Sequence, residues 1–162
     1  MLTIPNVLLN DGNRIPQLGF GVWQVSTRQI VPVVSTALEA GYRHIDTAAA
    51  YGNEHGVGQA IRESAIPRHQ LYVTTKLDNS DQGHARHALE DSLAALGLDY
   101  VDLYLIHWPV PDKRAESWRA LEAIKAGDCQ LGMIPVENSI AGRMADVHHL
   151  LPSSGLKIRR MP

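Results

Sequence analysis

The chain has 162 residues, with 15 Lys or Arg against 17 Asp or Glu, so its formal net charge is −2. This balance gives no electrostatic reason to expect nucleic acid or a membrane as a partner. No apolar run approaches the roughly 20 residues of a spanning helix, and the first residues lack the basic and apolar stretches of a signal peptide. A single cysteine, Cys129, excludes an intrachain disulfide. We therefore expect a globular protein of the reducing cytoplasm.

Turn and strand signals begin at the N-terminus. Asp11-Gly12, flanked by residues 7–9 and 14–15, predicts a β-hairpin. Strands and helices then alternate. The predicted strands cover residues 17–20, 44–47, 71–75 and 101–106. The predicted helices cover residues 27–40, 54–64, 83–96 and 113–126. Ser26 with Gln29 predicts a capping box for the first helix, and the predicted helix stops are Gly41, Gly97 and Gly127.

Four strand–helix repeats predict an α/β fold with a parallel sheet. Each repeat takes about 30 residues, which matches roughly 250 residues for the eight units of a barrel. We therefore expect a partial (β/α) TIM-type barrel with four such units, which 162 residues do not close. A rearranged open or domain-swapped α/β sheet is the alternative. Residues 131–136, 139–150 and 156–158 predict a further strand, helix and strand.

Polar residues follow the apolar strands at positions that predict a catalytic rim. Asp46, Lys76 and His107 come where strands end, and Tyr51 comes just past one. In parallel α/β folds these ends face the same edge, where active sites are built. An ammonium beside a phenol stabilises the phenolate, an aspartate holds the ammonium, and a histidine can hydrogen-bond a carbonyl oxygen. Because no side chain supplies a hydride, the set predicts carbonyl reduction with a nicotinamide cofactor.

Four motifs carry a resemblance to a known family. They are G-Y-R-H-I-D-T-A at 41–48, Y-G-N-E at 51–54, T-K-L at 75–77 and L-G-L-D-Y-V-D-L-Y-L-I-H-W-P at 96–109. With these motifs, residues 1–126 resemble the N-terminal half of an aldo-keto reductase. The resemblance implies a (β/α) barrel that reduces aldehydes and ketones with NADPH.

The resemblance also implies a role for each residue of the rim. It assigns Tyr51 as the general acid, Lys76 as the cation that tunes it, and Asp46 as the partner of Lys76. His107 would orient the carbonyl group of the substrate. The implied apolar walls of the substrate pocket are Trp23 and Trp108. Asp46 is the only residue that the resemblance assigns to the cofactor, and no metal site is expected. The alternatives left open are a purely structural Asp46–Lys76 ion pair and tryptophans that only pack.

Residues 130–158 resemble a different family. L-G-M-I-P-V-E-N-S-I-A-G-R at 131–143 and A-D-V-H-H-L-L-P at 145–152 are similar to an internal piece of prephenate dehydratase. The T-R-F catalytic motif of that family is absent, so no dehydratase activity is expected. The two resemblances predict a chimera of a truncated reductase half-barrel, residues 1–126, and a grafted strand–helix–strand, residues 127–162, within one domain.

Three functions follow from these resemblances. The first is a reductase-derived oxidoreductase that is inactive or very weak, because the half that holds the adenosine phosphate is not found. The second is a self-associating module without catalysis, and the third, least favoured, is a prephenate-binding fragment. Open sheet edges recruit other strands, so we expect the chain to pair with itself, as a dimer. A small carbonyl substrate is expected only if catalysis survives.

Overall fold

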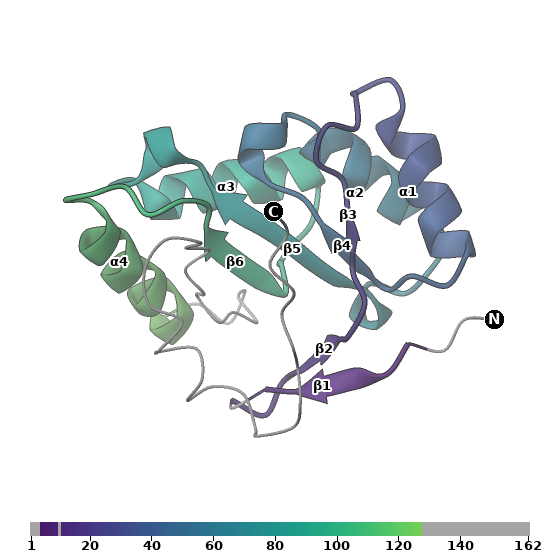
Figure 1. Ribbon diagram of the computed structural model, residues 1–162, viewed down its shortest axis with the longest axis horizontal. Coiled ribbons are helices and arrows are strands. Elements are labelled where there is room, and N and C mark those ends of the chain that lie inside the picture. The colour runs from purple at the N-terminus through teal and green to yellow at the C-terminus, as the bar shows by residue number, and fades with distance from the viewer. Residues whose placement is uncertain (1–3, 10, 128–162) are drawn as a thin grey trace, which may run out of the picture.

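The computed structural model describes residues 4–9 and 11–127, which form two sheets and a layer of helices (Figure 1). The first sheet is an antiparallel hairpin of β1 (Asn6–Leu8) and β2 (Arg14–Pro16). The second sheet has four parallel strands in the order β3-β4-β5-β6. Its strands are β3 (Phe20–Gly21), β4 (His44–Asp46), β5 (Tyr72–Leu77) and β6 (Leu103–Ile106).

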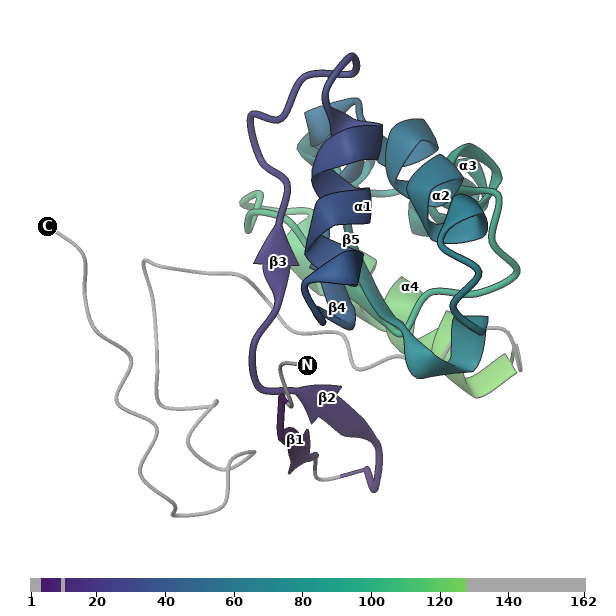
Figure 2. The same ribbon diagram turned by 90° about the vertical axis from the view of Figure 1, so that its right-hand side faces the viewer.

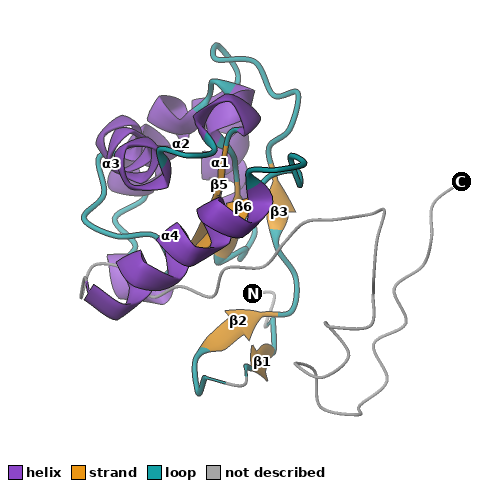
Figure 3. Cartoon of the chain, turned by 90° about the vertical axis from the view of Figure 1, so that its left-hand side faces the viewer, coloured by secondary structure: helices purple, strands orange, loops and turns teal. Residues whose placement is uncertain are grey.

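One helix follows each strand of the parallel sheet. The helices are α1 (Ile30–Glu39), α2 (Glu54–Glu63), α3 (Ala85–Leu96) and α4 (Arg114–Gly127). Three short 3-10 helices lie in the connections: η1 (Ala49–Tyr51), η2 (Arg68–Gln70) and η3 (Asn79–Asp81). Figure 2 shows α1, α2 and α3 together on one side of the strands. Figure 3 shows the β1–β2 hairpin set apart from this helical layer.

The hydrophobic core lies between the strands and these helices. Every residue of β5 is buried, as expected for a central parallel strand. Ile45 of β4 pairs in register with Val73 of β5, and Leu77 pairs with Ile106 of β6. All four side chains are fully buried in one cluster with apolar residues of the helices. The other face of β4 and β5 carries polar side chains, including the catalytic candidates Asp46 and Lys76.

The structure confirms one of the predicted helix-end signals and corrects another. Gly97 has φ 64°, and the Leu98 N–H donates to the Leu93 carbonyl at 3.1 Å, so the predicted stop of α3 is confirmed. The capping box is wrong in detail. The Ser26 hydroxyl donates to the side chain of Gln29 at 2.9 Å, and the regular helix begins only at Ile30. A side-chain pair thus replaces the expected bond to the backbone.

The four strand–helix units and the parallel sheet are confirmed. The predicted strand–helix–strand of residues 131–158 and Cys129 lie outside the described residues, and so does nearly all of the predicted second segment. The domain boundary at residue 126 stays a prediction. Among the described helices, none is both long and apolar enough to cross a bilayer.

A polar network lies at the amino ends of β5 and β6. The Arg68 guanidinium donates to Asp102 Oδ2 at 2.6 Å and to the Tyr100 carbonyl at 2.9 Å. Asp102 Oδ2 also accepts the Val73 N–H at 2.8 Å. Burial raises the pKa of Asp102, and the charge of Arg68 opposes this shift. Asp102 is the one acidic residue in the predicted strand 101–106, and it ties the strand ends together opposite the catalytic candidates.

Candidate active site

The carboxyl ends of three parallel strands bring the catalytic candidates together. Asp46 is the last residue of β4, Lys76 is the next-to-last residue of β5, and His107 directly follows β6. Tyr51 ends the short helix η1 that follows β4. Gly52 comes next with φ 64°, a left-handed conformation that glycine adopts readily. The predicted convergence of these four residues on one rim is therefore what the structure shows.

Lys76 lies at the centre of this arrangement, and it is only 4% exposed. Its Nζ lies 2.8 and 3.0 Å from the two carboxylate oxygens of Asp46 and 2.8 Å from the Thr47 carbonyl. The same Nζ lies 3.3 Å from the Tyr51 hydroxyl oxygen. An ammonium has three hydrogens to donate, and here they meet three different partners. Because the Tyr51 oxygen accepts from Lys76, its own hydrogen is left to point toward a bound molecule.

His107 completes the rim on the side of β6. Its ring meets the Tyr51 ring edge to face with 5.6 Å between centroids, and it stacks on Trp108 at 6.3 Å. Burial lowers the pKa of His107 and the charge of Lys76 lowers it further, whereas Asp78 and Asp46 oppose the shift. A neutral imidazole offers one donor and one acceptor nitrogen. At neutral pH, His107 can therefore either donate to or accept from a bound molecule.

The two tryptophans assigned to the pocket are both at the surface. Trp23 is 67% exposed in the loop after β3, and Trp108 is 46% exposed directly after His107. Only Trp108 is brought into ring contact with one of the four rim residues, His107. Their role as pocket walls stays a prediction.

Gln82 is a residue of the rim that the sequence did not single out. It is fully buried, and its side-chain amide donates to the Trp108 carbonyl at 2.6 Å. The neighbouring His107 N–H donates to the Leu77 carbonyl at 3.2 Å. Together these bonds fix the backbone of His107 from both sides. A glutamine within D-N-S-D-Q-G, a stretch typical of a loop, gave no signal of this role.

Asn53 is a second such residue, although it stands in the Y-G-N-E motif. Its side-chain amide donates to the carbonyls of Val22 and Val25 at 3.0 and 3.1 Å. Its Oδ1 accepts from the Thr47 hydroxyl at 2.9 Å. Asn53 thus fastens the loop that carries Trp23 to the segment that carries the rim tyrosine.

Glu54, the acidic residue of the same motif, holds the residue that precedes Lys76. Glu54 Oε1 accepts from the Thr75 hydroxyl at 2.6 Å, and both side chains are buried. Burial raises the pKa of Glu54, and the hydrogen bond from Thr75 opposes that shift. Since Thr75 directly precedes Lys76, this bond fixes the end of β5 against the start of α2.

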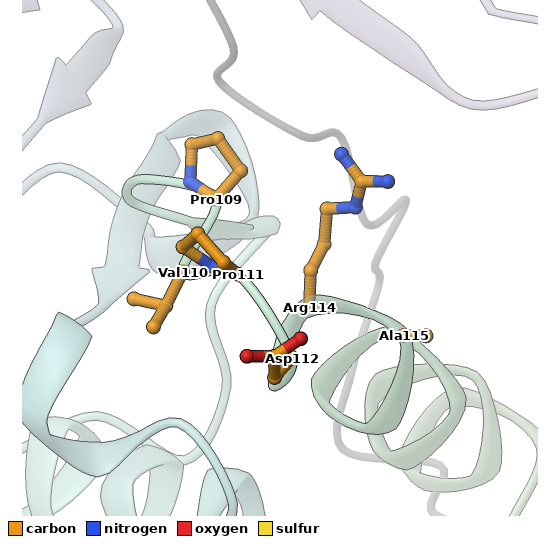
Figure 4. A pocket seen from close by; sticks show the side chains of 6 residues that line it. All are labelled: Pro109, Val110, Pro111, Asp112, Arg114 and Ala115. Atoms are coloured by element: carbon orange, nitrogen blue, oxygen red, sulfur yellow. The ribbon is translucent and has the colours of Figure 1, made fainter.

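A hollow of about 370 Å³ opens in the connection between β6 and α4. Figure 4 shows the six residues that line it: Pro109, Val110, Pro111, Asp112, Arg114 and Ala115. Asp112 has φ 68°, which is uncommon for a residue with a side chain. The hollow begins two residues after His107 and includes none of the four rim residues.

The part of the chain that the structure describes offers no cluster of metal ligands. There, no three His, Cys, Asp or Glu side chains gather closely enough to hold an ion.

Comparison with known proteins bears directly on this arrangement. A sequence model of the Aldo/keto reductase family matches residues 17–148. The chain belongs to the aldo/keto reductase family. It is 48% identical over 149 residues to Escherichia coli methylglyoxal reductase DkgA, covering 90% of this chain and 52% of that protein. It is 51% identical over 138 residues to a Mycobacterium sp. aldo-keto reductase, covering 83% and 50%.

Solved structures of aldo/keto reductases share the fold. A Brucella melitensis aldo/keto reductase matches with a TM-score of 0.80 at 51% identity, covering 91% of this chain and 57% of that one. A Bombyx mori aldo-keto reductase solved in complex with NADP matches with a TM-score of 0.74 at 38% identity, covering 83% and 51%. The parallel sheet with its helices is thus consistent with part of an aldo/keto reductase barrel.

The extent of these matches also bears on the predicted chimera. The family match continues to residue 148, beyond the predicted end of the reductase half at 126. The comparisons give no support for a prephenate dehydratase-like segment, so the chimera stays a prediction. The chain spans about half the length of the curated relatives described above.

Proposed function

We propose that this aldo/keto reductase reduces small aldehydes and ketones with NADPH, and that α-oxoaldehydes such as methylglyoxal are its substrate class. The observation that carries the proposal is the threefold donation of Lys76 to Asp46, the Thr47 carbonyl and Tyr51. Relatives named methylglyoxal reductase support the substrate class. The solved relative in complex with NADP supports the cofactor.

The rim residues divide the proton chemistry among them. Tyr51 donates its proton to the carbonyl oxygen as negative charge develops there. Lys76 stabilises the resulting phenolate, and Asp46 keeps the ammonium charged and oriented. Neutral His107 donates a second hydrogen bond to the same oxygen, which orients the carbonyl.

The residues of the rim fit a nicotinamide cofactor, because they supply a proton and no hydride. NADPH would supply that hydride when bound. The Asp46 side chain is 33% exposed, so its carboxylate can also accept a hydrogen bond from a cofactor hydroxyl. Asp46 is the only residue that the resemblance assigns to the cofactor, so we expect weak cofactor binding and very slow turnover from this chain.

The test is cofactor oxidation with methylglyoxal, followed by the absorbance of reduced nicotinamide. Tyr51→Phe removes the proton donor and keeps the ring, so any turnover should fall about 100-fold or more. Tyr100→Phe is the matched control, because the Tyr100 ring packs on Arg68 at 3.9 Å and its hydroxyl is remote from the rim. Equal turnover in the Tyr51→Phe variant and the wild type would refute the assigned role.

A cofactor titration tests the other half of the proposal. Trp108 is exposed and its ring stacks on His107, so cofactor that binds at the rim should quench tryptophan fluorescence. A saturable change shows that the chain holds NADPH. A flat titration up to millimolar cofactor would refute the use of NADPH by this chain.

We further propose a dimer of this chain. Within the described residues, β3 and β6 are the outer strands of the parallel sheet. Outer strands present backbone groups that can pair with another chain. Light scattering should therefore report twice the monomer mass, and a stable monomer at micromolar concentration would refute the dimer. A folded dimer without turnover would favour the self-associating module over the reductase.

A further inference from the structure

We propose that the same rim catalyses a second reaction that uses no cofactor: the enolisation of small α-hydroxy aldehydes and ketones. The product of one full cycle is the aldose–ketose isomer of the substrate. This inference rests on the proposed function in one respect, namely that Tyr51 meets a carbonyl oxygen. It differs from the proposed function in the role of His107, which here accepts a proton from carbon and does not only donate a hydrogen bond.

The first requirement is an acid that is set to protonate a carbonyl oxygen. The Tyr51 oxygen accepts from Lys76 Nζ at 3.3 Å, so its hydrogen faces away from the lysine. Lys76 is nearly buried and is held by Asp46 and the Thr47 carbonyl. Its fixed positive charge stabilises the tyrosinate that proton transfer leaves behind.

The second requirement is a base at the distance of the next carbon atom. The Tyr51 and His107 rings lie edge to face with 5.6 Å between centroids. A fragment O=C–C–H is short enough to place its oxygen at the phenol and its α-hydrogen at the imidazole. The backbone of His107 is held by Leu77, and that of the next residue by Gln82. The base is therefore positioned by hydrogen bonds to two buried residues, Leu77 and Gln82.

The proton balance of the reaction closes on these two side chains. The unprotonated nitrogen of His107 takes the α-proton, and the C–H electron pair becomes the C=C bond of an enediol. The former carbonyl π pair moves to oxygen, which takes the proton of Tyr51. In the second half, His107 returns its proton to the former carbonyl carbon. The hydroxyl on the former α-carbon gives its proton to Tyr51 and becomes the new carbonyl group. No oxidant or reductant is consumed.

An α-hydroxyl group is what makes this cycle productive. It places an oxygen on both carbons of the enediol, so the second half of the cycle can run from either end. The rim is open enough for such a molecule, because a third of the Asp46 side chain and nearly half of Trp108 are exposed. The substrate class is therefore a small, uncharged α-hydroxy carbonyl compound.

The test uses the full chain with dihydroxyacetone in D₂O, in an amine-free buffer and without cofactor. Proton NMR follows the loss of the CH₂ signal and the appearance of glyceraldehyde. The wild type should exceed the buffer blank at least tenfold. Tyr51→Phe and His107→Gln should each lower the excess rate about 100-fold, as expected for loss of a general acid or base. His87→Gln, an exposed site on α3, should leave it unchanged.

His107→Gln separates proton transfer from orientation. A glutamine amide still donates to a carbonyl oxygen, but it cannot take up a proton. Loss of exchange with an unchanged circular dichroism spectrum and urea midpoint supports the inference. Exchange at the blank rate in the wild type, or equal exchange in wild type and His107→Gln, overturns it. A parallel NADPH assay distinguishes the proposals: exchange without reduction refutes only the reductase, and reduction without exchange refutes only the enolisation.

Discussion

Replacement of Asn53 by alanine should loosen the rim without touching a catalytic side chain. Asn53 is buried, with 1% of its surface exposed, and it holds three groups through its side-chain amide. It donates to the carbonyls of Val22 and Val25 and accepts from the hydroxyl of Thr47. Alanine can make none of these bonds, and the space left is too enclosed for all three groups to regain a partner.

The expected loss of stability follows from which groups become orphaned. The Val22 carbonyl keeps a second partner, because the Val25 N–H donates to it at 3.2 Å. The Val25 carbonyl and the fully buried Thr47 hydroxyl each lose their bond to Asn53. A buried polar group left without a partner costs about 1–3 kcal/mol. We therefore expect Asn53→Ala to lower the free energy of unfolding by about 3 kcal/mol.

Urea unfolding followed by tryptophan fluorescence measures this effect. Trp23 lies in the loop that Asn53 holds, so its emission also reports loosening of that loop before global unfolding. Asn79→Ala is the control, since Asn79 is exposed and exposed substitutions stay within about 0.5 kcal/mol. A loss below about 1 kcal/mol for Asn53→Ala, or an equal loss in the control, would refute the reasoning.

Three further predictions concern the core and its pH dependence. Burial lowers the pKa of His44 below 6.5 in the folded state, so the unfolded state binds this proton at a higher pH. Thermal melts should therefore show stability that is retained above pH 6.5 and lost as the pH falls toward the pKa of folded His44. Gly58→Ala places a Cβ against the Leu96 carbonyl oxygen, so α2 and α3 must separate. Its free energy of unfolding in urea should fall by about 2 kcal/mol or more. The loss should exceed that of Gly56→Ala, where the clash is with the Ile30 side chain. Leu121→Ala empties a fully buried site of α4 and should cost about 2–5 kcal/mol in the same assay.

Most of the fold could be predicted because its units are local. Apolar periodicity placed all four strands and helices of the parallel units to within about three residues, since each helix buries one face. The predicted and observed boundaries differ where contacts with residues distant in sequence determine the backbone structure. Residue 17 was predicted to open a strand, but its N–H donates to the Pro5 carbonyl at 2.9 Å and so extends the hairpin. The partner of that bond lies twelve positions away, so no short window of sequence shows it.

The catalytic candidates were predictable for a different reason. Polar residues where apolar strands end are conspicuous, and parallel strands must bring those ends together. Gln82 and Asn53 were not predictable as positioning residues, because both stand in polar stretches that are typical of loops. Their importance comes from complete burial, and burial in a loop depends on neighbouring segments. The predicted strand 71–75 likewise ends too early, because Lys76 looks exposed in sequence but is buried by its ion pair.

The ion pair between Lys76 and Asp46 supports the proposed catalytic role of the rim over a purely structural one. A buried ion pair is weak evidence for stability, since apolar residues of similar volume often serve equally well. Stability is supplied at the opposite ends of the strands by Arg68 and Asp102, which bond backbone groups of the neighbouring strands. At the rim, by contrast, one hydrogen of the ammonium is directed to the oxygen of Tyr51. An apolar replacement could fill the volume of Lys76 but could not stabilise a tyrosinate. The cost of burying this charge is therefore consistent with the proton transfer that we propose at Tyr51.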